Sequence, residues 1–428
     1  MHLSALLGSQ LLSPSGEGVA KVDDVIVRLR GGEYPVVTGL VGKVGGRRLF
    51  VPVDRIQDLG EERVKLGEAK VDLRSFGRRD GEVLLREDIL GHRLIDVADA
   101  ELVRAWDVEL HQTAEGWVLS CLDTRRPARL GGLIRRSAGH PCKDWKAFEP
   151  LVGHTPSVRA RAVFGRVGRL KPAQIADLIE DASRSEGEEI LGAVHADPEL
   201  EADVFEELDP DIANRLFGDR SDAEVSDVLA HMRADDAADA VAELPQGRRQ
   251  AVLDLLPAGT RAKVLTLLGF NATSAGGIMG VDVLAAPADA TVEEALRRVR
   301  LAEHLQPEAL VTVHAVDGDN RLVGTVSVIV LLQAEPDARL LDVIDTDPVR
   351  VTAATDVVDV TLLVADYNLM TVPVVGDDDQ LLGVITVDDI LEATIPDDWR
   401  RREPPARPEP GTPETTTRTP TASTDPPR

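Results

Sequence analysis

The chain has 428 residues and a formal net charge of −26 at pH 7, with only seven Phe, four Trp and two Tyr. This length allows roughly two to four domains, each with its own core. Residues 1–165 hold 25 basic and 23 acidic residues, residues 166–399 hold 17 and 47, and residues 400–428 hold 6 and 4. Such a field repels nucleic acid and anionic lipid and leaves little aromatic surface for base stacking, so we exclude nucleic acid as a partner and favour cations.

Cysteine usage and hydropathy bear on the compartment. Cys121 and Cys142 form no Cys-x-x-Cys pair, and no leader segment is recognisable. We therefore expect a reducing, cytoplasmic location with neither a disulfide nor a zinc cluster. The apolar run Leu322–Leu332 is shorter than the roughly 18 residues that span a bilayer, and polar residues interrupt it, so we expect no transmembrane segment.

Short β-branched runs separated by Gly-rich turns fill residues 1–135, as in Val25–Val27 and Val83–Leu85. The pattern predicts a small antiparallel β domain. It also contains an internal repeat, because Leu7–Leu12 is echoed by Leu90–Ile95, each leading into a predicted strand. We therefore expect two similar half-barrels.

This repeated, glycine-containing motif resembles the PRC-barrel, a small barrel found in the photosynthetic reaction centre H subunit and in ribosome maturation proteins. The resemblance implies a domain that docks onto other proteins, and we find no catalytic constellation in it. The polar, Gly- and Pro-containing stretch that follows, residues 136–165, is interpreted as a linker.

A twelve-residue rhythm dominates residues 166–270. It is carried by Leu208, Met232, Leu244, Leu256 and Leu268. Proline follows several of these leucines within one or two residues, where it suits the first turn of a helix. Each unit is too short to be a stable helix alone, so we predict that the units stack into a superhelix with a leucine and alanine interior.

One predicted helix in this region concentrates negative charge. Asp235 and Asp236 lie where the helix begins, and Asp239 shares a face with Asp235 because the two are four residues apart. A first turn favours acids, but like charges at this spacing repel. Arg233 is the only nearby base in the sequence, so either water solvates this face or a cation occupies it.

Residues 271–396 contain two copies of about sixty residues, each with an amphipathic helix and a pair of apolar strands joined by an acidic turn. The strands of the second copy are Val372–Val375 and Leu381–Thr386. This β-α-β pattern resembles a tandem pair of CBS domains. Residues 397–428 are rich in Pro, Thr, Arg and Glu without apolar periodicity, and we predict a disordered tail. The fold class is therefore multidomain α+β.

The order of these parts resembles the cytosolic half of the MgtE family of magnesium channels. The resemblance rests on the alanine-rich superhelix, the joint Ser274–Met279, and the end of the CBS pair, Gly383–Leu391. In that family the helical domain folds against the CBS dimer when magnesium is plentiful and closes a transmembrane pore. Here we expect no pore, and a β domain precedes the helices.

The resemblance also implies magnesium ligands. The family's acids fall on Asp203, Asp235 and Asp239, its backbone contact falls on Gly277, and its CBS-side ligands fall on Asp356, the carbonyl of Ala365, Asp389 and, by conservative change, Glu392. Two positions depart from the family, because Val358 and Asn368 stand where acids are usual. Oxygen ligands suit Mg²⁺, which keeps several waters and needs only one or two carboxylates. The alternative is that these aspartates are solvated helix caps.

The CBS pair raises a second ligand. CBS repeats that bind nucleotide are expected to carry Gly-x-x-Thr/Ser-x-x-Asp, and Gly383, Thr386 and Asp389 match it. The first repeat has Val330 in place of the acid. We therefore expect at most one adenine nucleotide, such as ATP, per chain, and leave open whether Asp389 serves metal or ribose.

We thus expect a cytoplasmic, non-enzymatic, magnesium-responsive regulator that dimerises through its CBS domains. Its β domain would contact a protein partner, such as a membrane transporter, which would hold the chain at the membrane periphery. Two alternatives remain: an adenine-nucleotide sensor in which metal is incidental, and a PRC-barrel adaptor whose acidic face has no specific ligand. No Ser-His-Asp order, Walker loop or histidine-rich metal cage supports an enzyme.

Overall fold

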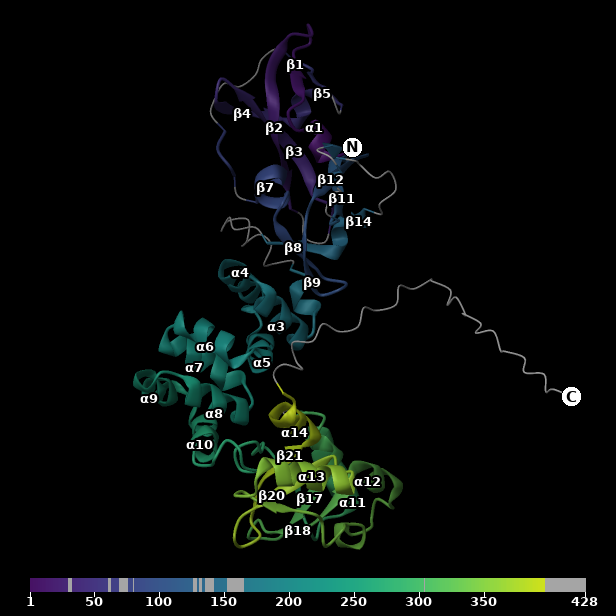
Figure 1. Cartoon of the computed structure of the whole chain (residues 1–428). Helices are drawn as coiled ribbons and strands as arrows, with labels where there is room; N and C mark the ends of the chain where they lie inside the picture. The colour runs from purple at the N-terminus through teal and green to yellow at the C-terminus, as the bar shows by residue number, and fades with distance from the viewer. Residues whose placement is uncertain are drawn as a thin grey trace, which may run out of the picture. The chain divides into compact units, whose positions relative to one another are not determined.

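The computed structural model is shown in Figure 1. It describes residues 1–29, 33–60, 63–68, 76–79, 81–125, 129–130, 133–134, 142–151, 165–303 and 305–396. The chain divides into two compact units, Met1–Gly269 and Phe270–Arg428. The predicted tail, residues 397–428, and most of the predicted linker, residues 136–165, lie outside the described residues.

The first unit begins with a β domain built on a ten-stranded sheet. Its strands are β1 (Gln10–Leu12), β2 (Gly18–Arg28), β3 (Val36–Val44), β4 (Arg47–Pro52), β5 (Ile56–Leu59), β6 (Arg63–Leu66), β7 (Glu82–Leu84), β10 (Asp107–Thr113), β11 (Gly116–Asp123) and β14 (Lys143–Asp144). The central order is β10-β11-β3-β2-β1-β6-β5, with β4, β7 and β14 paired to β3, β2 and β11. All pairs are antiparallel except β1 with β6.

Smaller elements complete this domain. They are helix α1 (Leu3–Leu6), the one-turn helices Val53–Arg55, Leu85–Ile89 and Trp145–Ala147, the hairpin β12 (Arg129–Leu130) with β13 (Leu133–Ile134), and a three-stranded sheet of β15 (Phe148–Pro150), β8 (Arg93–Asp96) and β9 (Glu101–Arg104). The β-branched and leucine side chains that mark the strands in the sequence turn inward, and Trp145 and Phe148 join the same core. Residues 143–150, which fall in the predicted linker, therefore pack into the β domain.

The internal repeat has a structural counterpart. Gly8 and Gly91, at equivalent positions of the two copies, have φ of +84° and +80°, which glycine adopts at little cost. The Gly8 N–H donates to the carbonyl of Val22, in β2, at 2.8 Å, and the Gly91 N–H donates to the carbonyl of Ala105, the residue after β9, at 2.7 Å. The same turn is thus built twice, but the strands that follow lie in different sheets, β1 in the ten-stranded sheet and β8 in the three-stranded sheet.

The expectation of unpaired cysteines is wrong. Cys121 and Cys142 form a disulfide, with their Cα atoms 5.7 Å apart. The cause is tertiary: β14 pairs antiparallel with β11, and Cys142 comes directly before β14 while Cys121 lies within β11. A separation of 21 residues without a spacing motif gives no sign of this contact in the sequence.

The helical part of the first unit follows the predicted period of twelve residues. Within residues 165–269, after the turn Val167–Arg169, the helices are α3 (Pro172–Asp181), α4 (Arg184–Val194), α5 (Pro198–Glu207), α6 (Pro210–Gly218), α7 (Asp222–His231), α8 (Ala234–Glu243), α9 (Gln246–Leu255) and α10 (Ala258–Leu267). The predicted residues Leu208, Met232, Leu244 and Leu256 are all buried between helices, whereas Leu268 is 37% exposed. Helices two apart pack together, α3 on α5, α5 on α7 and α6 on α8, which confirms the superhelix (Figure 1).

Local signals set the starts of these helices. Proline occupies the first turn of α3, α5 and α6, where its missing N–H is not needed. Ser221 caps α7 and exchanges hydrogen bonds with Glu224, and Asp197 and Asp209 cap α5 and α6.

One ion pair joins the β domain to the superhelix. The Arg93 Nε donates to Glu186 Oε1 at 3.0 Å, its Nη2 donates to the other carboxylate oxygen, and its Nη1 donates to the Asp181 carbonyl at 3.0 Å. The Arg93 guanidinium lowers the pKa of Glu186 to about 2. Two-point contact between a guanidinium and a carboxylate fixes direction as well as distance, so the first helices are oriented on the β domain.

The second unit contains two β-α-β copies. The first has β16 (Ala285–Pro287), α11 (Val292–Leu301), β17 (Thr312–Val316), β18 (Leu322–Ser327) and α12 (Val328–Gln333), and the second has β19 (Val351–Thr352), α13 (Val357–Tyr367), β20 (Thr371–Val375), β21 (Leu381–Thr386) and α14 (Val387–Thr394). Each copy forms a three-stranded sheet. The Thr371 hydroxyl donates to the Thr312 hydroxyl, 59 residues earlier, at 2.9 Å. Equivalent residues therefore meet, as the duplicated sequence predicts.

No helix among the described residues has the length and the apolar character required to cross a membrane.

The disulfide supplies a stability prediction. We expect Cys142→Ser to lower the free energy of unfolding by about 3 kcal/mol under oxidising conditions, because the bond closes a loop of about 20 residues in the unfolded chain. Urea unfolding followed by circular dichroism measures this. With dithiothreitol the parent and the variant should unfold alike, and a difference that persists in the reductant would contradict the assignment.

Candidate metal-binding site

The predicted acidic helix is α8. Asp235 and Asp236 occupy its first turn, where the helix dipole favours negative charge, and Asp239 lies one turn later on the exposed surface. The buried residues of α8 are Ala234, Ala237, Ala238 and Val241, so the opposite side of the helix packs. Asp239 is therefore exposed, whereas Asp235 and Asp236 are partly buried.

Arg233 organises the buried side of this charge cluster. Its Nε contacts the Asp236 carboxylate at 2.5 Å and lies 3.7 Å from Glu206 Oε2, and its backbone N–H donates to Glu206 Oε1 at 2.6 Å. Burial alone would lower the pKa of Arg233, but the carboxylates of Asp236 and Asp235 raise it overall. The arginine therefore remains a cation that holds α8 against α5.

One arginine does not balance the acids around it. Burial raises the pKa of Glu206 to about 7, and the nearby charges of Asp203 and Asp235 raise it further while Arg233 opposes them. Burial, then the charge of Asp235, also raises the pKa of Asp236 well above its ordinary value. No sequence pattern indicates the role of Glu206, because it lies 27 residues from Arg233 and belongs to another helix.

The structure brings two predicted ligands together around Glu206. Asp203, in α5, and Asp235, in α8, both lie close enough to act on its carboxyl. The Asp203 residue is exposed, yet partial burial of its carboxyl raises the pKa, with Glu199 adding to the shift. Two half-solvated carboxylates next to further negative charge form a surface that attracts cations.

The joint before the CBS copies is a tight turn. The Gly277 N–H donates to the Ser274 carbonyl at 2.8 Å, and a Cβ on Gly277 would collide with the backbone of Asn271 and Ala272. Ser274 in turn forms a backbone bridge to Asp356. Gly277 is therefore required by packing, and the joint is tied to the start of the helix that carries the next predicted ligands.

That helix is α13, with Asp356 at its N-cap. The exposed Asp356 carboxylate accepts from the Val358 N–H at 2.9 Å, and Val358, where the MgtE resemblance expects an acid, presents an apolar side chain that is 62% exposed. At the other end, the N–H groups of Asn368 and Leu369 both donate to the Val364 carbonyl. Neither N–H therefore donates to the carbonyl of Ala365. The MgtE resemblance expects that carbonyl to bind metal, which is compatible with this arrangement.

The remaining predicted residues surround the start of α14. The Asp389 carboxylate accepts from the Thr386 N–H at 2.7 Å and from its hydroxyl at 2.9 Å, and both side chains are buried. Asp389 thus completes a capping box with Thr386, the N-cap of α14. Gly383 is buried where a Cβ would meet Met279 and the Gly280 carbonyl, and Glu392 lies exposed in α14.

The donor chemistry fits Mg²⁺ best at the exposed carboxylates. Asp203, Asp235, Asp239 and Asp356 offer oxygen ligands beside solvent, which suits an ion that keeps several waters. In the part of the chain that the structure describes, none of these acids belongs to a group of three ligand atoms within 4.8 Å; the group that does is Glu109, Cys121 and Cys142. Any metal bound by these described acids would therefore take few direct carboxylate ligands and keep most of its waters.

Comparison with known families decides the identity of the two regions beyond the β domain. The MgtE intracellular N domain matches residues 170–273, and the CBS domain matches residues 275–337 and 340–395. Residues 170–395 form an MgtE N domain followed by two CBS domains. The predicted resemblance is confirmed for this region, while the PRC-barrel-like character of the β domain stays a prediction.

The MgtE region has curated relatives. It is 36% identical over 157 residues to the magnesium transporter MgtE of Thermus thermophilus, covering 37% of this chain and 35% of the relative. It is 32% identical over 130 residues to the magnesium transporter MgtE of Enterococcus faecalis, covering 30% and 28%. The chain thus spans about a third of the length of these relatives.

Solved structures give the same fold for the N domain and CBS pair. The cytosolic domain of the Mg²⁺ channel MgtE in complex with ATP aligns with a TM-score of 0.51 and 28% identity, over 56% of this chain and 95% of that one. The soluble part of a magnesium transporter aligns with a TM-score of 0.51 and 23% identity, over 58% and 95%.

The raised pKa of Glu206 predicts a pH-dependent effect. The pKa of the Glu206 carboxyl is about 7 in the folded N domain and 4.5 in the unfolded chain. The folded state therefore binds the proton more tightly, and stability falls as pH rises between these values. We expect Glu206→Gln, which removes the charge and keeps an acceptor for Arg233, to raise the melting temperature at pH 8 by roughly 2–4 °C, equivalent to about 1 kcal/mol, and to change little at pH 5. Thermal unfolding at both pH values checks this; lower stability at pH 8 would show that the Arg233 ion pair outweighs the cost of burial.

Proposed function

We propose that this chain is a magnesium-responsive regulatory protein. One observation carries the proposal. Carboxylates of the N domain lie at or near the surface, next to a largely buried group of acids that a single arginine, Arg233, neutralises only in part. Relatives named as magnesium transporters support it, because they are similar to 157 and 130 residues of this chain. The CBS-side residues Asp356, Ala365 and Glu392 are proposed as further ligands.

The physical basis is neutralisation of like charge. Two acidic surfaces repel in the absence of metal, and a divalent ion between them converts that repulsion into attraction. At an effective dielectric near 20, one unlike pair about 4 Å apart contributes roughly 4 kcal/mol, so a few ions can shift an equilibrium between a loose and a packed arrangement of the N domain and CBS domains. Such a device regulates by changing shape and needs no catalytic residue.

The β domain is the part that we propose transmits this state to a protein partner. Arg93 ties it to α4, so a change in the packing of the N domain reaches the β sheet through a directional contact. We propose a cytoplasmic location, peripheral to the membrane when the partner is a membrane transporter.

We also propose that the CBS domains form a homodimer. Several large apolar side chains on their helices are exposed, namely Leu301 on α11, Ile329 and Leu332 on α12, Val358 and Leu362 on α13, and Leu391 on α14. Because α11 packs on α12 and α13 packs on α14, these side chains gather on two adjacent helix pairs. An apolar surface of this kind is typical of a self-complementary interface.

A second candidate function is adenine-nucleotide sensing. Thr386 and Asp389 stand at the N-terminus of α14 after Gly383, in the order expected for a nucleotide-binding CBS repeat, and a related cytosolic domain was solved with ATP. The buried hydrogen bonds between Thr386 and Asp389 weigh against it, because both groups already cap the helix.

Limited proteolysis distinguishes the two functions. With Mg²⁺ titrated from micromolar to tens of millimolar concentration, we expect progressive protection of the segment between residues 160 and 280, independent of ATP. Protection that requires ATP and ignores Mg²⁺ would favour the nucleotide sensor. A cleavage pattern that changes with neither would contradict both.

The dimer is tested by a charge placed on the CBS helices. We expect Leu362→Asp to convert the dimer into a monomer in sedimentation equilibrium, because a carboxylate cannot be buried unpaired in an apolar interface. Leu255→Asp, at a similarly exposed leucine of α9, is the matched control and should leave the dimer intact. A dimer that survives Leu362→Asp and dissociates with Leu255→Asp would place the interface elsewhere.

A further inference from the structure

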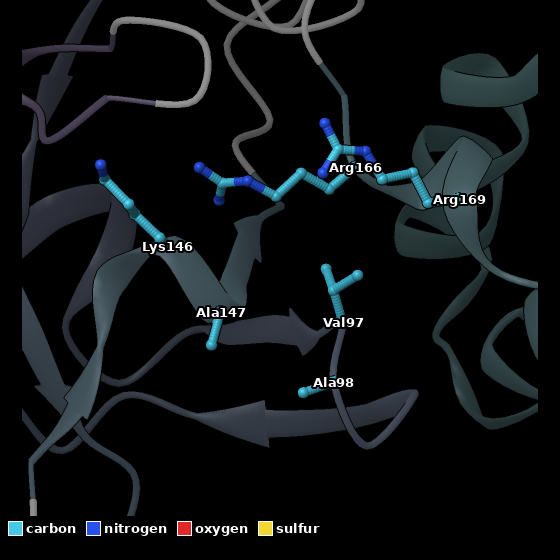
Figure 2. Close-up of a pocket in the computed structure, with 6 residues that line it drawn as sticks. All are labelled: Val97, Ala98, Lys146, Ala147, Arg166 and Arg169. Atoms are coloured by element: carbon cyan, nitrogen blue, oxygen red, sulfur yellow. The ribbon is translucent and has the colours of Figure 1, made fainter.

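A cationic cavity lies in the first unit, away from the acidic candidates. It has a volume of about 380 Å³ and is lined by Val97, Ala98, Lys146, Ala147, Arg166 and Arg169. Figure 2 shows Lys146 and the two arginines as long side chains above Val97, Ala98 and Ala147. In a chain of net charge −26, three cations around one cavity are an exception that needs a physical account.

The walls of the cavity are held by the fold. Val97 and Ala98 form the turn after β8, where the Val97 N–H donates to the Ala147 carbonyl at 2.9 Å. Arg166 is fixed by its Nη1, which donates to the Phe148 carbonyl at 2.7 Å. The shape therefore rests on the β sheet and on a guanidinium anchored at one nitrogen, which leaves other N–H groups of Arg166 for a ligand.

Nearby acids do not cancel the positive charge. The buried Glu149 accepts from the Arg166 backbone N–H at 3.1 Å, and Glu33, which is 73% exposed, lies 3.5 Å from Lys146 Nζ. Exposed pairs such as the second contribute little. The Arg169 guanidinium has neither an ion pair nor a hydrogen bond with the described residues, and Asp96, beside Val97, is already paired with Lys143. The cavity keeps a surplus of positive charge.

From this arrangement we infer that the cavity binds a small molecule bearing phosphate groups. Guanidinium groups match phosphate oxygens with two parallel hydrogen bonds, and a flexible lysine adds a point charge. The volume exceeds that of a single phosphate and lies within the range of small-ligand sites. The methyl groups of Val97, Ala98 and Ala147 provide an apolar wall opposite the cations. The ligand would sit where the β domain leads into the N domain.

Isothermal titration calorimetry of the full chain with inorganic tripolyphosphate, in EDTA to remove divalent metal, tests the inference. We expect one site per chain, and a loss of affinity of roughly tenfold or more in the double variant Lys146→Ala, Arg169→Ala, since each lost charge-assisted hydrogen bond has an effect of that order. Both side chains are exposed, so the fold should survive, and circular dichroism confirms it.

Two controls make the result specific. Lys43→Ala with Lys65→Ala removes the same charge from exposed positions of the β domain outside the cavity and should leave affinity unchanged. Citrate, a carboxylate polyanion, should bind much more weakly than tripolyphosphate. Absence of binding to the parent, equal losses in both double variants, or equal affinity for citrate would each overturn the inference.

Discussion

The central constraint on this protein is fixed negative charge. Residues 166–399 carry 47 acidic and 17 basic residues, and much of that charge stands on short helices that leave little interior in which to neutralise it. Where the chain does bury acids, as at Glu206 and Asp236, a single arginine serves both and their pKa values rise. The acids left at the surface are balanced by water or by cations, and on the proposed function a divalent metal would change how the N domain packs.

The β domain differs in charge and in construction. It contains two copies of one glycine turn, and its acids and bases are nearly equal in number. It meets the N domain through Arg93, which binds Glu186 at two points and the end of α3 at a third. The β domain is thus a platform on which the first helices have a defined orientation, and the cationic cavity lies along the same stretch of chain.

Much of this architecture follows from local sequence. The period of twelve predicts the helices of the N domain because a proline or a capping residue begins several of them and a buried leucine or methionine follows several of them. The duplicated strands predict two CBS copies. Contacts between distant segments were not predictable in this way. Glu206 with Arg233, Arg93 with Glu186, and Cys121 with Cys142 join residues that only the tertiary fold brings together. The MgtE resemblance predicts Asp203, Asp235 and Asp239. The proximity of Asp203 and Asp235 to Glu206 and Arg233 is seen only in the structure.

Solution X-ray scattering of the full chain during a Mg²⁺ titration tests the central claim most directly. The account predicts that the parent becomes more compact as Mg²⁺ rises, and that Asp203→Asn, Asp235→Asn and Asp239→Asn together abolish the change. A matched triple variant, Asp211→Asn, Asp227→Asn and Glu243→Gln, removes the same charge from other exposed positions of the N domain and should compact like the parent. Equal metal-dependent compaction in all three proteins would contradict the account.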